Sequence, residues 1–291
     1  MPCIRKTSAY PNASTTVTCP TGATSSINPN SINPQCNIQD ICGLSKFSNP
    51  NIPDQWYRFI IPIFLHGGII HLLFNLGFQL RTGIQMEKDF GWWRLGIIYF
   101  SSGTFGFIFG ATFAENTPSV GCSGALYGKY SIYNSVFSFF LKYLLPFLGF
   151  SITFTFSPYQ QIGLLACLLL DLIQNWKLII NPVIELFKML GIIIISLAIG
   201  FLPYIDNFAH MGGFLTGIVS GLVFMPSITF GKWDKRRKRL LALISLPILI
   251  VMFYVTLDAF YKGNTFCPYC KYLNCLPIPG SFGCDAKTGT L

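Results

Sequence analysis

Apolar residues in this chain gather in long, uninterrupted runs instead of alternating with polar ones. A helix needs about 20 mostly apolar residues to cross the hydrocarbon core of a bilayer. Six runs have this length, and they lie at residues 59–80, 93–113, 123–142, 183–203, 206–226 and 240–260. A further apolar stretch at 144–175 has no clear number of crossings. The pattern predicts an all-α polytopic membrane protein, with a membrane core at 55–230 and an additional transmembrane helix at 240–260.

The composition agrees with this pattern. Hydrophobic residues make up 52% of the chain and charged residues 11%, whereas roughly a quarter of the residues in a soluble globular protein are charged. This balance excludes an ordinary soluble domain and makes the lipid bilayer a partner. Residues 1–54 differ, because they are rich in Asn, Pro, Ser and Thr and contain no apolar run. A polytopic chain that begins in this way is expected to lack a first helix, so we interpret it as N-terminally incomplete.

Basic residues set the expected orientation, because Lys and Arg near helix ends stay on the cytoplasmic side. Residues 232–239 carry six basic side chains and one acidic one. We therefore expect 231–239 to be a cytoplasmic loop. Counting crossings back from this loop puts the turn at 176–182 inside as well, and the basic residues Arg81, Lys88 and Arg94 put the turn at 81–94 on the same side. The same count puts the N-terminal segment 1–54 and the tail 261–291 outside.

Eight of the ten cysteines fall in the two segments assigned outside. They are Cys3, Cys19, Cys36, Cys42, Cys267, Cys270, Cys275 and Cys284. Cysteines in an oxidising compartment usually form disulfides, and the glycosylation sequon Asn12-Ala13-Ser14 lies on the same side. This predicts disulfides in an oxidising lumen or the extracellular space. A zinc site at Cys267-Pro-Tyr-Cys270 is the alternative. Much of the net charge of +9 comes from basic residues that set the membrane topology, so no nucleic-acid partner is expected.

The three histidines all lie at or within apolar segments, where ionisable groups are costly and usually functional. His71 and Asn75 are four residues apart, so they share one helix face and can donate to one atom. His66 and His71 are five residues apart, about 140° around a helix axis, which argues against a zinc pair. No metal site is expected. The alternative interpretation is that these histidines are satisfied by helix packing.

Ser123 is the candidate nucleophile. It begins an apolar helix after an outer loop, within the step Gly121-Cys122-Ser123-Gly124. The glycines permit close backbone approach, and N–H groups at a helix start can bind an oxyanion. Tyr127 lies one turn further on the same face. The alternative is an N-capping serine beside packing glycines.

His210 is the candidate general base, just inside the outer end of its helix. Small residues recur every four positions from Ala209 through Gly213 and Gly217, giving a stripe on which a second helix can pack closely. Gly124 and Gly128 would be the complement of this stripe on the serine helix. Such packing would bring Ser123 and His210 to the same depth.

The chemistry that follows is a serine nucleophile activated by histidine, with His71, Asn75 and backbone N–H groups holding the oxyanion. No acidic residue is clearly placed to orient His210. Asp206, one turn earlier, is a weak candidate, and stacking by Tyr127 is another way to fix the ring. The sequence therefore favours a dyad that needs no cofactor.

Three motifs on three helices, "HGGIIHLLFN", "GCSGALYG" and "AHMGGFLTG", together resemble the rhomboid family of intramembrane serine proteases. The resemblance covers roughly 52–260 and includes "QWYRF" at 55–59. It implies a rhomboid-like helical bundle that cleaves single-pass membrane proteins near the outer membrane face. It also implies Ser123 as nucleophile, His210 as base, His71 and Asn75 as oxyanion donors, and Tyr127 stacking on the His210 ring. The further helix and Cys-rich tail look like the eukaryotic six-plus-one class, most like fungal members.

Two alternatives remain at this point. One is a catalytically inactive rhomboid-like protein with a binding or trafficking role. The other is a transporter or channel that uses the histidines as a proton relay, against which the Gly-x-Ser-Gly motif and its matching glycine stripe argue.

The segment 129–163 interrupts the resemblance. The serine helix must cross once between Ser123 and Trp176, and these residues are too many for one crossing and too few for three. Removing 129–163 leaves "GCSGALYGLLACLLLDLIQNW", which is one crossing. Codons for Gly128-Lys129-Tyr130 can contain a splice donor, and those for Ile162-Gly163 an acceptor. We therefore interpret 129–163 as translated intron, with a genuine insertion as the alternative.

Overall fold

The computed structural model describes only part of the chain. These residues are 3–4, 14–15, 36–37, 42–49, 52–66, 69, 72, 76, 79–114, 160–199, 206–263 and 270. Helices dominate the described part, which confirms the expected all-α membrane protein with an additional C-terminal helix. The one ladder described lies in the N-terminal segment, where β1 (Ser14–Thr15) pairs antiparallel with β2 (Cys36–Asn37).

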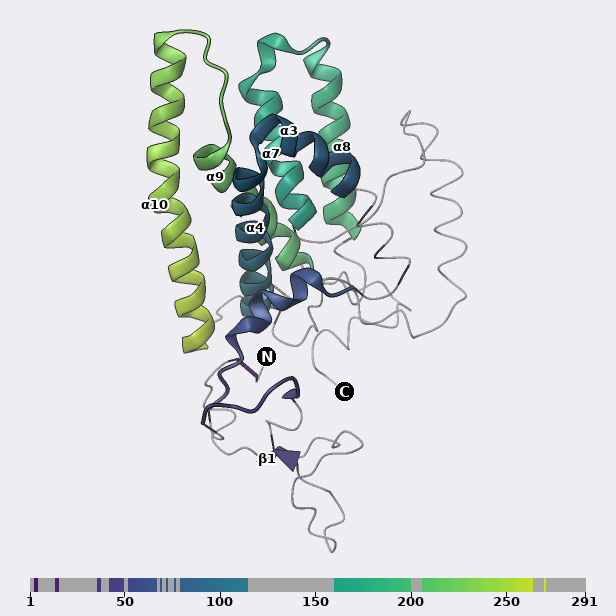
Figure 1. Cartoon of the computed structure of the whole chain (residues 1–291), viewed down its shortest axis with the longest axis vertical. Helices are drawn as coiled ribbons and strands as arrows, with labels where there is room; N and C mark the ends of the chain where they lie inside the picture. The colour runs from purple at the N-terminus through teal and green to yellow at the C-terminus, as the bar shows by residue number, and fades with distance from the viewer. Residues whose placement is uncertain are drawn as a thin grey trace, which may run out of the picture.

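Short helical turns and five longer helices follow in chain order (Figure 1). The turns are η1 (Trp56–Phe59), η2 (Ile61–Phe64), the π-helical η3 (Gln79–Gly83), α3 (Ile84–Phe90) and η5 (Trp176–Leu178). The longer helices are α4 (Trp92–Phe113), α7 (Gln160–Gln174), α8 (Pro182–Ile199), α9 (Asn207–Phe224) and α10 (Lys232–Lys262). Among the described residues, α4, α9 and α10 are long and apolar enough to cross a membrane, and α7 contributes a shorter apolar helix at Ile162–Gln174.

Four of the expected spans, 93–113, 183–203, 206–226 and 240–260, coincide with α4, α8, α9 and α10. The structure differs from the expectation at 231–239, because these residues form no loop. Lys232 to Arg239 instead make the first two turns of α10, so the basic segment and the additional span are one continuous helix. The first expected span, 59–80, begins with the 3₁₀ turns η1 and η2.

Helix α9 lies at the centre of the bundle, in contact with α4, α7, α10 and α8. Glycines allow this close packing. A Cβ atom added at Gly212 would lie 2.8 Å from the Cβ of Phe109 on α4, and one added at Gly217 would lie 2.6 Å from the Cα of Gly163 on α7. In a bilayer, where lipid tails are as apolar as the side chains, such backbone-close contacts drive helix association.

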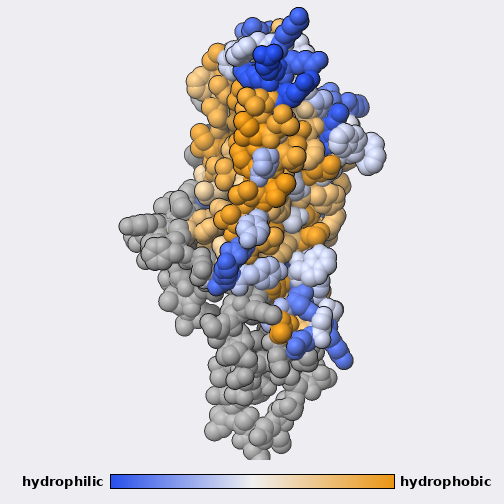
Figure 2. All heavy atoms as spheres, turned by 90° about the vertical axis from the view of Figure 1, so that its left-hand side faces the viewer, coloured by the Kyte–Doolittle hydropathy of each residue, from blue (hydrophilic) through white to orange (hydrophobic). Residues whose placement is uncertain are grey.

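The two ends of the bundle are polar and the middle is apolar. The turn after α7, the loop before α10 and α3 all lie toward the upper end in Figure 1. Figure 2 shows hydrophilic side chains at that end and a broad hydrophobic band below it. The three segments expected inside, 81–94, 176–182 and 231–239, are therefore grouped at one end. Residues 42–59 and the C-terminal end of α10 lie at the other.

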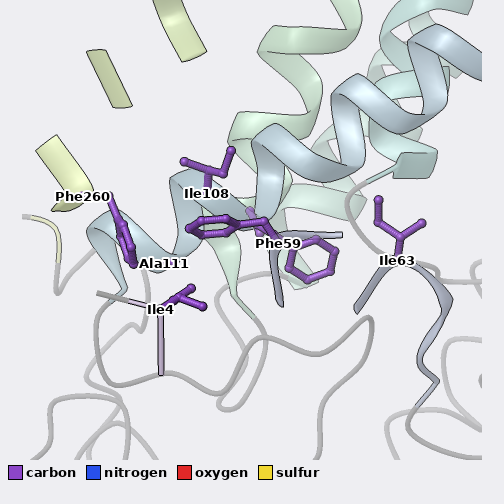
Figure 3. Close-up of a cluster of buried hydrophobic side chains, with 8 residues drawn as sticks. Ile4, Phe59, Ile63, Ile108, Ala111 and Phe260 are labelled. Atoms are coloured by element: carbon purple, nitrogen blue, oxygen red, sulfur yellow. The ribbon is translucent and has the colours of Figure 1, made fainter. Parts of the chain in front are cut away.

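At the end of the bundle opposite residues 231–239, an apolar cluster joins the N-terminal segment to the membrane helices (Figure 3). Its buried members are Ile4, Phe59, Ile63, Phe107, Ile108, Ala111, Ala209 and Phe260. The rings of Phe59 and Phe260 meet edge to face, with centroids 5.2 Å apart. Ile4 follows Cys3 directly, so the disulfide between Cys3 and Cys42 holds Ile4 within this cluster. The disulfide prediction is thus confirmed at these two cysteines, and Cys270 is also disulfide-bonded.

Candidate active site

His210 lies in the first turn of α9 and is buried, with 5% of its surface exposed. Asp206 begins this helix as its N-cap, and its side chain accepts a hydrogen bond of 3.1 Å from the backbone N–H of Ala209. An acceptor at this position satisfies one of the backbone donors that a helix start leaves unpaired. The cap therefore fixes where α9 begins and, with it, the depth of His210.

The described partner of the His210 ring belongs to α8. Nδ1 of His210 lies 3.3 Å from the backbone oxygen of Ser196. Asp206 is the acidic residue that the sequence offers for orienting the ring. In this structure its carboxylate caps the start of α9. The sequence carries no signal for the Ser196 contact, because any residue type can supply a backbone carbonyl.

The glycine stripe of α9 packs against α7. Gly217 faces Gly163, and the thiol of Cys167 donates to the backbone oxygen of Gly217 at 3.1 Å. One turn further along, Gly221 faces Cys167 and Leu170. The contacts advance together along both helices, so α7 and α9 run parallel. Among the described residues, the glycine that contacts Gly217 is therefore Gly163. On the sequence alone, Gly163 is the last residue of the suspected intron.

Several predicted site residues lie outside the described residues. They are Gly121, Ser123, Gly124, Tyr127, Gly128, His71 and Asn75. Their assignments stay predictions. Of the predicted set, the structure places His210, Gly213 and Gly217, all on α9. His66 is described as well, and its Nδ1 donates to the backbone oxygen of Phe64 at 3.1 Å.

A hydrogen-bonded network supports the N-terminal segment near the start of α9. The buried amide of Gln55 donates to the backbone oxygens of Gly43 and Ser45, each at 2.8 Å. Nε of Arg58 donates to Oε1 of Gln55 at 2.6 Å, and Nη2 of Arg58 donates to the backbone oxygen of Cys42. Burial lowers the pKa of the Arg58 guanidinium from its ordinary value. This network, within "QWYRF", ties the disulfide-bonded loop to the turns that precede the histidine motif.

A bundle of apolar helices with a buried histidine in the first turn of its central helix defines a polytopic membrane protein with a candidate intramembrane site. The sequence profile of the Rhomboid domain matches residues 53–159 and 130–227. The chain belongs to the rhomboid family.

Relatives within this family carry two kinds of name. The chain is 34% identical over 245 residues to inactive rhomboid protein 1 of Rattus norvegicus, covering 84% of this chain and 24% of the relative. Inactive rhomboid protein 1 of Danio rerio is also 34% identical over 245 residues, with the same coverage of 84% and 24%. Rhomboid-type serine protease 2 of Emericella nidulans is 35% identical over 238 residues, covering 78% of this chain and 39% of the relative. The chain thus spans about a quarter of the length of the inactive relatives that it matches.

Proposed function

We propose that this protein is an intramembrane serine endopeptidase that hydrolyses peptide bonds of single-pass membrane proteins near the outer membrane face. Ser123 is the nucleophile and His210 the general base, while His71, Asn75 and backbone N–H groups at Gly121 and Gly124 stabilise the oxyanion. The observation that carries the proposal is a buried histidine on a helix whose glycines pack against α7. The serine motif would continue directly into α7 if 129–163 were absent.

The register of α7 supports this assignment if 129–163 is absent from the active form. Gly128 would then precede Leu164 directly and take the place of Gly163. That place accepts only glycine, because a Cβ atom there would lie 2.5 Å from the side chain of Ser102. Excision at this junction thus replaces one glycine with another.

The same register brings the two catalytic residues to one depth. Ser123 lies five residues before Gly128, and His210 lies seven residues before Gly217. Helices α7 and α9 are parallel, and an α-helix rises about 1.5 Å per residue, so Ser123 and His210 would differ in depth by about 3 Å. Gly124, four residues before Gly128, would face α9 near Gly213. Ser123 would stand two residues before the first residue of α7, where backbone N–H groups are available for an oxyanion.

The family comparison also favours an interruption at this point. The Rhomboid profile matches in two pieces, and residues 130–159 fall in both. An uninterrupted domain would be expected to match in one piece. We therefore propose that 129–163 is inserted into the serine helix, as a translated intron or as a genuine insertion.

The finer assignments follow from the proposed activity and the expected topology. Disulfides in the outer segments support a place in the secretory pathway, at the Golgi, endosome or plasma membrane. The substrates would be transmembrane proteins, which reach the site from the surrounding bilayer.

A second candidate is an inactive rhomboid with a binding or trafficking role, which the names of the relatives from Rattus norvegicus and Danio rerio favour. Against it, this chain contains both Ser123 and His210 in matching motifs. The two candidates differ in one measurable property, namely whether Ser123 is a reactive nucleophile.

The deciding experiment is labelling of the reconstituted protein with a fluorophosphonate probe, followed by mass spectrometry of the labelled peptide. The full chain and a variant lacking 129–163 should be compared, each with Ser123→Ala and His210→Ala. We expect labelling at Ser123 that each substitution reduces by about 10³-fold or more. His71→Ala and Asn75→Ala should reduce substrate cleavage by about 10- to 10³-fold, as loss of one oxyanion donor does.

Two outcomes would count against the proposals separately. Folded protein of both lengths that never labels at Ser123 would favour the inactive candidate. Equal labelling of both lengths would contradict the role given to the insertion while leaving the nucleophile in place. Sequencing transcripts across codons 120–175 distinguishes intron from insertion, because an intron predicts messages without the 105 nucleotides that encode 129–163.

A further inference from the structure

The contact between His210 and Ser196 bears on how the base is oriented. A backbone carbonyl oxygen can only accept a hydrogen bond, so the ring nitrogen facing it must carry the proton. Nδ1 of His210 lies 3.3 Å from that oxygen. In the neutral imidazole a proton on Nδ1 leaves the lone pair on Nε2. Nε2 is then the nitrogen that can take a proton from a serine hydroxyl.

Ser196 lies in the last turn of the described part of α8 (Pro182–Ile199). A backbone carbonyl oxygen has two lone pairs, so it can accept a hydrogen bond from Nδ1 of His210 whether or not it also accepts one within its helix.

We infer that the backbone carbonyl of Ser196, on α8, orients His210. The inference rests on the proposed function for its consequence. In a catalytic triad a buried carboxylate holds the histidine tautomer and stabilises the imidazolium that forms. Here the carbonyl oxygen of Ser196 holds the tautomer and turns its partial negative charge toward the ring, while the candidate carboxylate, Asp206, serves as the cap of α9. Ser196 is thus a positioning residue that acts through its backbone.

This arrangement makes the base depend on where α8 sits. The helix contacts α7 and α9 through apolar side chains, chiefly Ile193 against Leu165 and its neighbours. A displacement of its C-terminal end would remove the acceptor from Nδ1. The ring would then be free to adopt the other tautomer, in which Nε2 carries the proton and cannot act as a base.

The direct test is the tautomer of His210, measured by NMR on the full chain with isotope-labelled histidine in lipid nanodiscs. The chain has three histidines, so His210→Gln and His66→Gln assign the signals. At a pH where the ring is neutral, we expect the proton on Nδ1. A proton on Nε2 in the unmodified protein would overturn the inference.

A functional test weakens the carbonyl and leaves every side chain in place. Replacing Leu197 by its α-hydroxy analogue converts the carbonyl of Ser196 into an ester, which is a poorer acceptor. The matched control is the same exchange at Ile193, which alters the carbonyl of Ile192 and removes one helical N–H in the same way. We expect the Leu197 ester to shift the tautomer toward Nε2–H and to lower kcat by about 3- to 10-fold, the size of one neutral hydrogen bond. KM should stay unchanged, and the control should match the parent chain.

The outcomes separate this inference from the proposed function. An Nδ1–H tautomer in a chain that never reacts with fluorophosphonate would refute the protease and leave the orientation by α8 intact. An active chain in which the Leu197 and Ile193 esters behave alike would confirm the protease and refute the orientation.

Discussion

Helices α8 and α9 are both 18 residues long, and they hold their places in different ways. Ten residues of α9 are buried, five of them glycine or alanine. By contrast, α8 exposes Val183, Ile184, Phe187 and Ile194, and adding a Cβ atom at its Gly191 would meet nothing within 4 Å. Helix α9 is fixed by backbone-close contacts on several sides, whereas α8 is a peripheral helix with one packed face.

This difference separates two requirements of the proposed chemistry. The base needs a constant depth relative to the nucleophile, and α9 gives His210 that depth through its cap and its glycines. The orienting carbonyl comes from the less constrained helix. The comparison predicts that equal changes in the two helices have unequal consequences.

The largest effect is expected from filling the α7–α9 contact. Gly217→Leu would place side-chain atoms where Gly163 now lies, with a first carbon 2.6 Å from its Cα. Neither backbone can yield without separating the helices, so we expect the protein to lose its folded state in mild detergent. The matched control, Gly191→Leu on α8, should fold normally and gain up to about 1 kcal/mol from helix propensity. Unfolding curves for the two variants measure this contrast, and similar curves would refute it.

The next effect concerns activity. His210→Ala on α9 should lower cleavage of a reporter transmembrane substrate by about 10³-fold or more, because no other general base is expected at this depth. Ser196→Ala on α8 should stay within about twofold of the parent, since the backbone carbonyl is kept. A large loss in Ser196→Ala would assign the role of this residue to its hydroxyl group.

A smaller effect is expected at the start of α9. Asp206→Ala removes the N-cap acceptor and should lower the free energy of unfolding by about 0.5–2 kcal/mol. Asp206→Asn keeps an acceptor at the same place and should recover most of this loss. Thermal unfolding of the three proteins in one detergent is the measurement. If the Asn variant is as unstable as the Ala variant, the carboxylate has a role beyond the cap.

The smallest effect is expected on the surface of α8. Lys188 and Glu185 form an ion pair of 2.9 Å, with about half of each side chain exposed. Exposed pairs of this kind contribute roughly 0–1 kcal/mol, so Glu185→Gln should change the unfolding free energy by no more than about 0.5 kcal/mol. A loss as large as that of Asp206→Ala would show that α8 is held more firmly than its exposure indicates.

Much of the fold could be predicted because a bilayer constrains sequences strongly. A span needs a fixed number of apolar residues, and cysteines and basic residues separate to opposite ends. The spans at 93–113, 183–203, 206–226 and 240–260 followed from this alone, as did disulfides in the N-terminal segment and the C-terminal tail. The glycine stripe at Gly213 and Gly217 also predicted a close helix contact, and Gly217 makes one with Gly163 of α7.

Tertiary structure decided which groups meet across helices. The spacing of the cysteines along the sequence does not determine which of them pair. The bond between Cys3 and Cys42 depends on how the N-terminal segment packs. The register of α7 against α9 chose Gly163 as the partner of Gly217, although Gly163 had been assigned to a foreign segment. Helix α10 continues through the basic residues 232–239. Their charge indicates a side of the membrane, but it does not end a helix, so the sequence pattern did not show this continuity.

For Asp206 and His210, too, the sequence does not show which atoms form hydrogen bonds with each other. One turn separates the two residues in sequence, so an acidic partner was a reasonable candidate, and the structure uses that carboxylate as a helix cap. The Nδ1 partner is a main-chain oxygen from another helix. Side-chain chemistry is written in the sequence, whereas the positions of backbone carbonyls depend on where each helix ends and how the helices pack.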